Sequence, residues 1–334
     1  MPAPKKPHLL CMAPIPAFLA DTLAESYQCH TSLEDGEEPL IRALVGSGTS
    51  LYREGLLQIL PQLEHISVYG PGYGGVPLDY CRKRGIKVSH TPDIVTDDIA
   101  DIAMALVLMT SRRLVEASDF LHAGRWPEGT FPPGSRLSGK CAGILGLGRV
   151  GKAVGRRLEA CGMRVGYTSR IPQIGATYPY FSSLHDLAFW CDFLIVACPG
   201  GSATRHLVNA SVLEALGSEG TLINISRGSV VDEEALVYAL EHKLIRTAGL
   251  DVFEKEPLVP DELVRLPQVV LLPHLGSSTR ESRQEMARLV IGNLDAHFQG
   301  SPLLTPVPEL RVTTQRRTET VTLFSSPAAA TASK

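Results

Sequence analysis

Three glycines between residues 146 and 151 stand at the spacing of a dinucleotide-binding turn, Gly146-Leu147-Gly148-Arg149-Val150-Gly151. The apolar run Ala142–Leu145 before them predicts a strand, and residues 149–161 after them predict a helix. The first glycine allows a tight bend, the second lets the backbone approach a pyrophosphate, and the third lets helix and strand pack closely. Free N–H groups at the helix start attract that anion. We therefore predict cofactor contacts at Gly146, Gly148, Arg149, Val150 and Gly151.

The residues that end the next predicted strand discriminate between NAD(H) and NADP(H). A site for NAD(H) usually places Asp or Glu about twenty residues after the glycines, where it binds the ribose 2′-hydroxyl. This chain has Tyr167-Thr168-Ser169-Arg170 there, with no carboxylate. Arg170 can pair with a 2′-phosphate through two hydrogen bonds, and Ser169 can donate another. NADP(H) is therefore the expected cofactor, and NAD(H) is the weaker alternative.

Four further motifs accompany the glycine turn in a fixed order along the chain. They are Thr91-Pro92 with Thr96-Asp97-Asp98-Ile99-Ala100-Asp101, Leu222-Ile223-Asn224-Ile225-Ser226-Arg227-Gly228, Gly249-Leu250-Asp251-Val252-Phe253-Glu254-Lys255-Glu256-Pro257, and Pro273-His274-Leu275-Gly276. With these motifs, from about residue 40 to residue 306, the chain resembles the D-2-hydroxyacid dehydrogenases. The resemblance is to the branch of glyoxylate, hydroxypyruvate and hydroxyphenylpyruvate reductases, and several ordered motifs are far more specific than any single one.

The resemblance places catalysis on Arg227, Glu256 and His274. Reduction of a 2-keto acid needs a cation that holds the carboxylate and polarises the carbonyl, which suits the guanidinium of Arg227. It also needs a proton donor for the developing alkoxide, and His274 is the natural choice because an imidazole can give up and take up a proton under physiological conditions. Glu256 would pair with His274 and favour its protonated form. All three follow apolar runs that predict strands, and open α/β sheets bind ligands at strand ends.

Two more residues enter through the resemblance alone. Asp251 matches a family position that contacts the nicotinamide carboxamide, although an aspartate at a strand end is often only structural. Cys198, followed by a proline, ends a strand at the cofactor edge, where family members bind the adenosine. We expect a cofactor contact there and no role for the thiol.

The family also binds the substrate carboxylate through backbone N–H groups in a loop of small residues, which matches residues 69–74 here. Gly70, Pro71 and Gly72 are the predicted substrate-binding residues. Pro71 departs from the usual pattern because proline has no N–H to donate. Gly74 also departs from it, since an aspartate is common at that position. Anion binding is therefore expected to shift onto Gly72 and its neighbours.

Short apolar runs alternate with helix-length segments along most of the chain, which favours parallel sheets covered on both faces. Predicted strands in the first hundred residues are His8–Ala13, Ala43–Gly46, Ile66–Tyr69 and Ile86–Ser89. A second set comprises Ala142–Leu145, Arg164–Tyr167, Phe193–Ala197, Thr221–Ile225, Thr247–Val252 and Val269–Leu272. The predicted class is α/β with two doubly wound parallel-sheet domains. A Rossmann cofactor domain (residues 98–283) is inserted in a smaller flavodoxin-like substrate domain (residues 1–97 and 284–306).

Three segments outside these sheets have their own predictions. Thr96–Leu114 is one long amphipathic helix, and Gly124–Gly139 is an extended surface loop. Since the family dimerises through its cofactor domains, both are candidate surfaces of a homodimer. Phe131 either reaches a neighbouring active site or packs locally in its loop. Residues 307–334 have little apolar periodicity, which predicts a disordered tail.

Composition excludes some partners. The net charge of −3 gives no electrostatic reason to expect nucleic acid or an anionic membrane surface. The seven cysteines are odd in number and show no CxxC spacing, which argues against a metal site or a disulfide framework. A reducing, cytoplasmic setting is the expectation.

The predicted function is NADPH-dependent reduction of a small 2-keto acid such as glyoxylate, hydroxypyruvate or 2-ketogluconate to the D-2-hydroxy acid. Two alternatives stay open at this point. One is an enzyme like phosphoglycerate dehydrogenase, which the missing cofactor carboxylate and the absence of a regulatory domain after residue 306 disfavour. The other is a dinucleotide-sensing regulatory protein, which a turnover assay would distinguish from a reductase.

Overall fold

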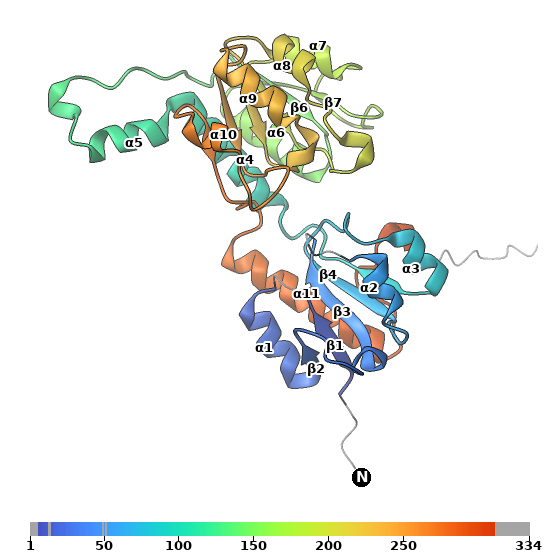
Figure 1. Cartoon of the computed structure of the whole chain (residues 1–334). Helices are drawn as coiled ribbons and strands as arrows, with labels where there is room; N and C mark the ends of the chain where they lie inside the picture. Colours follow the sequence, from blue (N-terminus) through green and yellow to red (C-terminus); the bar gives the residue numbers. More distant parts are fainter. Residues whose placement is uncertain (1–5, 13–14, 49, 51, 311–334) are drawn as a thin grey trace, which may run out of the picture.

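Five parallel strands form the first sheet, in the order β2-β1-β3-β4-β5. This computed structural model describes residues 6–12, 15–48, 50 and 52–310 of the 334-residue chain. The strands are β1 His8–Cys11, β2 Gln28–His30, β3 Ile41–Ser47, β4 His65–Tyr69 and β5 Lys87–Ser89. One face is covered by α2 (Glu54–Gln58) and α3 (Leu78–Arg84), and the other by α1 (Ala17–Ser26) and α11 (Arg280–Phe298) (Figure 1). The order is that of the flavodoxin-like fold, as predicted.

Six parallel strands form the second sheet, in the order β11-β10-β9-β8-β6-β7. They are β6 Cys141–Leu145, β7 Arg164–Thr168, β8 Phe193–Val196, β9 Thr221–Asn224, β10 Thr247–Leu250 and β11 Val270–Leu271. Helices α4 (Thr96–Arg112) and α6 (Arg149–Ala160) pack on one face. The opposite face carries α7 Leu184–Trp190, α8 Ala210–Leu216, α9 Glu233–Glu241 and α10 Asp261–Arg265. This is a Rossmann-type sheet, and its strand order reverses between β6 and β8.

Burial explains why these short runs become strands. Every residue of β6, β8, β9 and β10 is buried, as is typical of a parallel sheet with helices on both faces. The helices are amphipathic and bury one side each. In α6, for example, Ala153, Val154 and Leu158 are fully buried. The prediction of two doubly wound α/β domains is thus confirmed.

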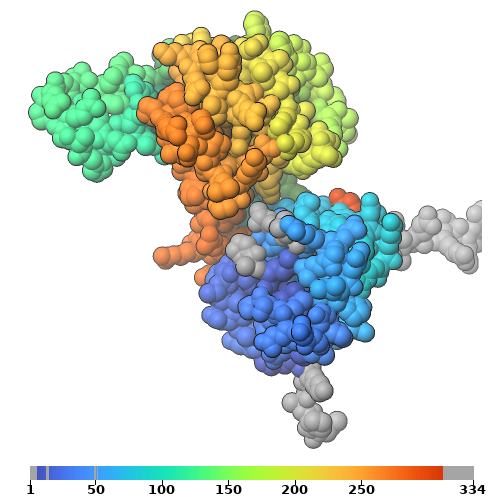
Figure 2. Space-filling model, viewed as in Figure 1, coloured from blue at the N-terminus to red at the C-terminus, as the bar shows by residue number. Residues whose placement is uncertain are grey.

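Two chain crossings join the two sheets at a narrow waist (Figure 2). The first leads from β5 into α4, and the second leads from β11 into α11. The Thr279 hydroxyl, at the start of α11, donates to the Asp98 carboxylate of α4 at 2.7 Å, so the two crossings contact each other. No helix in the described part of the chain has the length and apolar character needed to cross a membrane. The exact domain limits at residues 97 and 283 stay a prediction.

The predicted helix Thr96–Leu114 is interrupted in the structure. It ends at Arg112, because Arg113 adopts a left-handed conformation with φ 54°, and a separate helix α5 (Leu114–His122) follows. The Arg113 guanidinium pairs with Glu116 and lies 5.0 Å from the centre of the Phe131 ring, which stabilises this bend. Helix α5 and residues 123–135 project from the second sheet as an arm (Figure 1). Of the predicted loop Gly124–Gly139, only Trp126–Glu128 forms a short 3₁₀ turn.

The first residues of the predicted tail are ordered. Val307 is fully buried against the first sheet, and its N–H donates to the carbonyl of Val88 at 2.9 Å. A 3₁₀ turn, Pro308–Leu310, follows. The prediction of disorder was therefore wrong for residues 307–310, because one apolar side chain and one β-type hydrogen bond anchor them. The rest of the predicted tail lies outside the described residues, as does Ala13 of the predicted first strand.

Candidate active site

The glycine turn lies at the point where the second sheet reverses its strand order. Gly146 has φ 99°, and a Cβ there would lie 2.7 Å from the backbone of Cys198, which follows β8. A Cβ at Gly151 would lie 2.1 Å from the Gly146 carbonyl oxygen. A Cβ at Gly148 would meet nothing within 4 Å, so this glycine faces open space. Gly146 therefore makes the bend, Gly151 allows close packing, and Gly148 lies on the open side of the turn.

Helix α6 starts at this turn, with Gly148 as its N-cap residue. Arg149 and Val150 form its first turn, in which no acidic side chain occurs. The Arg149 side chain reaches away from the helix and pairs with Asp93 at 2.7 Å. The N–H groups in the first turn of a helix have no partner within the helix, and together with the helix dipole they attract an anion such as a pyrophosphate. Gly148, which has no side chain, leaves room for that anion beside them. The residues present therefore fit a dinucleotide.

Ser169 and Arg170 follow β7, the strand next to β6. The Ser169 hydroxyl donates to the carbonyl of Ile171 at 2.6 Å, and the backbone carbonyl of Ser169 accepts from the Tyr180 hydroxyl at 3.3 Å. Arg170 is exposed. Ser169 is thus part of a closed turn, whereas Arg170 is the residue whose side chain extends into solvent beside the cofactor edge.

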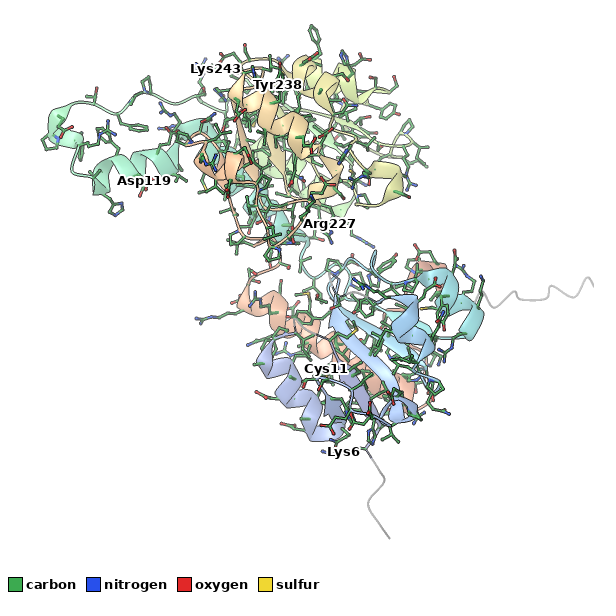
Figure 3. All side chains as sticks on the ribbon, viewed as in Figure 1. Lys6, Cys11, Asp119, Arg227, Tyr238 and Lys243 are labelled. Atoms are coloured by element: carbon green, nitrogen blue, oxygen red, sulfur yellow. The ribbon has the colours of Figure 1, made fainter. Side chains whose placement is uncertain are left out.

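Arg227 follows β9 and extends toward the first sheet (Figure 3). Its Nη1 donates to the Ser226 carbonyl at 2.6 Å, and a Cβ added to Gly72 would lie 2.5 Å from its Nη2. The guanidinium therefore touches the loop predicted to bind the substrate carboxylate. Arg227 is exposed, but the protein atoms around its guanidinium partly desolvate it and lower its pKa, while the negative charge of Glu256 acts in the opposite direction.

Glu256 and His274 form a direct pair. Nδ1 of His274 lies 2.8 Å from Oε2 of Glu256, and the two side chains are 33 % and 27 % exposed. The Phe253 N–H donates to the other carboxylate oxygen of Glu256 at 3.1 Å. Partial burial raises the pKa of Glu256, but the hydrogen bond and charge of His274, the Phe253 N–H and the charge of Arg227 outweigh it. The net pKa of Glu256 is below its ordinary value.

Asp251 holds the loop that carries His274. Its carbonyl accepts from the His274 N–H at 2.9 Å, and its carboxylate accepts from the N–H groups of Leu275 and Gly276 at 2.6 and 2.9 Å. His274 has φ 54°, a conformation that needs such support. Burial raises the pKa of Asp251, against the effect of these two N–H donors. The carboxylate that was predicted to contact the cofactor thus already stabilises the loop of His274.

The loop Gly70–Gly72 follows β4 and is held by residues that follow β5. The Gly70 N–H donates to the Thr91 hydroxyl at 2.9 Å, and Nδ1 of His90 lies 2.9 Å from the Pro71 carbonyl. With no N–H at Pro71, Gly72 is the member of this loop that combines an N–H with contact to Arg227.

Cys198 is buried beside Gly146, and burial raises the pKa of its thiol to about 11. A neutral, buried thiol agrees with a packing role rather than a reactive one. The structure therefore places Cys198 next to the cofactor turn through its backbone.

Sequence reasoning missed the residues that support Arg227. Asn224 accepts from the Ser226 N–H and donates to the Arg227 carbonyl, both at 3.1 Å. The Ser226 hydroxyl donates to the Cys198 carbonyl at 2.6 Å, which ties this loop to the strand beside it. Gly228 packs directly on the Phe253–Glu254 backbone. Asn224, at the end of an apolar run, could have indicated this role, because a buried amide without hydrogen-bond partners would destabilise the fold.

A family model described as the D-isomer specific 2-hydroxyacid dehydrogenase, NAD binding domain, matches residues 104–276. This chain belongs to the D-2-hydroxyacid dehydrogenase family. The matched range contains the glycine turn, Arg227, Glu256 and His274. The resemblance inferred from four ordered motifs is thereby confirmed, and the chain is an oxidoreductase with a nicotinamide dinucleotide cofactor.

Individual relatives extend the match to nearly the whole chain. It is 42% identical to glyoxylate/hydroxypyruvate reductase A of Arabidopsis thaliana, over 90% of this chain and 98% of the relative. It is 47% identical to hydroxyphenylpyruvate reductase of Plectranthus scutellarioides, over 80% and 85%. Among solved structures, an NADPH-dependent glyoxylate/hydroxypyruvate reductase from Sinorhizobium meliloti, in complex with NADP and malonate, superposes with a TM-score of 0.87. That protein is 40% identical, and the match covers 91% of this chain and 98% of the other.

Proposed function

We propose that this protein reduces small 2-keto acids, such as glyoxylate, hydroxypyruvate or 2-ketogluconate, to D-2-hydroxy acids with NADPH. The observation that carries the proposal is the 2.8 Å pair of His274 and Glu256 beside Arg227, at strand ends that also hold the glycine turn. The names of the relatives support the reductase branch over an enzyme like phosphoglycerate dehydrogenase.

The proposed roles follow from the chemistry of each side chain. Arg227 and the Gly72 N–H bind the substrate carboxylate, and the guanidinium also polarises the carbonyl. The nicotinamide, when bound, supplies a hydride to the carbonyl carbon. Because Nδ1 of His274 pairs with Glu256, Nε2 of His274 donates the proton that converts the carbonyl oxygen into a hydroxyl. Glu256 stabilises the protonated ring before transfer and fixes its orientation.

The test is a steady-state assay of the purified protein with each keto acid and with NADPH or NADH, followed by the loss of cofactor absorbance. We expect turnover with at least one of the three keto acids and a higher kcat/KM with NADPH. Absence of turnover with all of them, while NADPH still binds, would favour the sensor alternative instead.

Arg170 is proposed to be the residue that selects NADP(H). Loss of a hydrogen bond between charged groups costs about 1.5–3 kcal/mol, so Arg170→Ala should raise KM for NADPH roughly 10- to 100-fold. KM for NADH should change by less than about two-fold, since NADH has no 2′-phosphate for Arg170 to bind. Arg156→Ala, another exposed arginine of the same domain, is the matched control. Equal effects of R170A on both cofactors would disprove the assignment.

We also propose a homodimer formed through α4 and the arm. None of the nine residues of α5 is buried, and an isolated helix this short is not stable in water. Leu114, Leu121 and Trp126 are 46, 54 and 66 % exposed on the arm. A hollow of about 470 Å³ at the base of the arm is lined in part by Arg113, Gln268 and Val270. A second copy of the chain would cover these apolar side chains.

Light scattering after gel filtration tests the dimer. The wild type should have the mass of two chains, and Leu121→Asp should shift it toward one chain because it places a charge in the contact. Phe189→Asp, which alters a still more exposed apolar residue on α7, is the control and should leave the mass unchanged. A wild-type mass of one chain would remove the proposal.

The role of Phe131 follows the same test. Its ring packs edge-on against Phe120 at 5.5 Å between ring centres, so within one chain it packs locally on the arm. A contribution to a neighbouring active site stays a proposal that depends on the dimer.

All seven cysteines are free thiols, which supports the proposed cytoplasmic location.

A further inference from the structure

The backbone of Phe253 and Glu254 touches both halves of the proposed catalytic site. The Phe253 N–H donates to Oε1 of Glu256 at 3.1 Å. On its other side lies Gly228, the residue after Arg227. A Cβ on Gly228 would lie 1.9 Å from the Phe253 carbonyl carbon and 2.2 Å from the Glu254 nitrogen. Two successive peptides that share Phe253 therefore contact the Glu256 carboxylate and the loop of Arg227.

The next N–H along the chain is bound by Glu233, which has no part in the function proposed above. The Glu254 N–H donates to Oε1 of Glu233 at 2.7 Å. Glu233 is the first residue of α9, and the N-cap Asp232 fixes the start of that helix by accepting from the Ala235 N–H at 3.1 Å. Two successive N–H groups thus bind two carboxylates, one in the catalytic site and one on a helix behind it.

Glu233 lies in a partly buried, charged environment. Burial raises its pKa, the Glu254 N–H and the positive charge of Lys255 lower it, and the negative charges of Glu254 and Glu256 raise it again. A partly buried carboxyl beside two others needs a hydrogen-bond donor to stay stable. The Glu254 side chain is bound separately, by Arg205 at 2.6 Å and His206 at 3.3 Å. Its side chain therefore has its own anchor, and Glu233 acts on the backbone.

We propose that Glu233 is a positioning residue for the Glu256–His274 pair, acting through the backbone of Phe253 and Glu254; this inference rests on the proposed function of that pair. Without the Glu233 acceptor, the Glu254 N–H is unsatisfied and the backbone at Glu254 loses the bond that fixes it. A shift of this backbone is passed through Phe253 to the preceding peptide, whose N–H holds Glu256, and through Glu256 to the ring of His274. A small displacement of a proton donor lowers turnover strongly. The cofactor turn lies on other strands and is unaffected.

Two substitutions separate the hydrogen bond from the charge. Glu233→Gln keeps an Oε1 acceptor and removes only the charge, whereas Glu233→Ala removes both. We expect E233A to lower kcat about ten-fold with KM for NADPH unchanged, and E233Q to restore kcat to within about two-fold of wild type. Glu234→Ala, the exposed neighbour on the same helix, is the matched control and should behave as wild type.

Hydrogen–deuterium exchange of residues 253–257 gives a second measurement that does not depend on activity. Exchange should be faster in E233A and unchanged in E233Q and E234A. Wild-type kcat and exchange in E233A would overturn the positioning role even if His274 proves essential. An equal loss of kcat in E233A and E233Q would also overturn it, because the charge would then be responsible. If the wild type reduces no keto acid, the proposed function fails, and exchange alone decides whether Glu233 holds the peptide.

Discussion

Alanine in place of His274 is expected to lower kcat by about 10²- to 10⁴-fold, the range measured when a general acid is removed. His274 is held by two contacts of different kinds, the 2.8 Å bond of its imidazole to Glu256 and the bond of its backbone N–H to the Asp251 carbonyl. Such a side chain is fixed before substrate arrives, so its loss removes proton transfer rather than binding. KM for NADPH should therefore stay within about three-fold of wild type.

Steady-state kinetics of H274A and of His242→Ala test this expectation. His242 is an exposed histidine that stacks on Tyr238 of α9, so its removal should leave kcat unchanged. Circular dichroism of both variants would establish that they fold. If H274A keeps more than about a tenth of the wild-type kcat, His274 is not the proton donor.

Lysine in place of Arg227 is expected to lower kcat/KM for the keto acid by about 10²- to 10³-fold, although the positive charge is kept. The planar guanidinium can bind a carboxylate and a carbonyl at once, whereas an ammonium is a single compact charge. The Arg227 side chain also touches Gly72, and the shorter lysine would lose that contact. The loss should appear in both kcat and KM for the keto acid.

Arg265→Lys is the matched control, since Arg265 is an exposed arginine on α10 of the same domain. Fluorescence titration with NADPH should give the same Kd for R227K, R265K and wild type. A kcat/KM for R227K within ten-fold of wild type would show that charge alone suffices at this position. The prediction that the planar guanidinium of Arg227 is needed for activity would then be wrong.

The sequence predicted the fold well where burial is periodic. Strands such as β6 and β8 are apolar throughout, because a parallel sheet buries both faces, and such runs are easy to recognise. Strand β2 was missed because its three residues, Gln28–His30, lie at the sheet edge and are only partly buried. The bend at Arg113 was missed because a left-handed arginine has no sequence signature. Its cause is an ion pair and a ring contact that exist only after folding.

The candidate site was predicted where residue type determines chemistry. The spacing of the glycines follows from backbone sterics, and each of the three has the expected environment or conformation. Asp251 shows where this kind of prediction fails. The residue type alone does not tell whether a buried aspartate contacts a cofactor or stabilises a loop. The distinction needs the positions of the Leu275 and Gly276 N–H groups, which come from a separate segment. Glu233 was missed for the same reason, since nothing local marks a glutamate that binds a backbone 21 residues away.

The return of α11 to the first sheet has a consequence for biosynthesis. Val290 and Leu294 of this helix are fully buried against strands that leave the ribosome more than two hundred residues earlier. The cofactor domain is continuous in sequence, so it can fold while the chain is still being made. The substrate domain must wait until the last helix emerges, and until then α1 alone covers that face of its sheet. A chaperone that shields apolar strands would therefore be needed by the amino-terminal part of the nascent chain first.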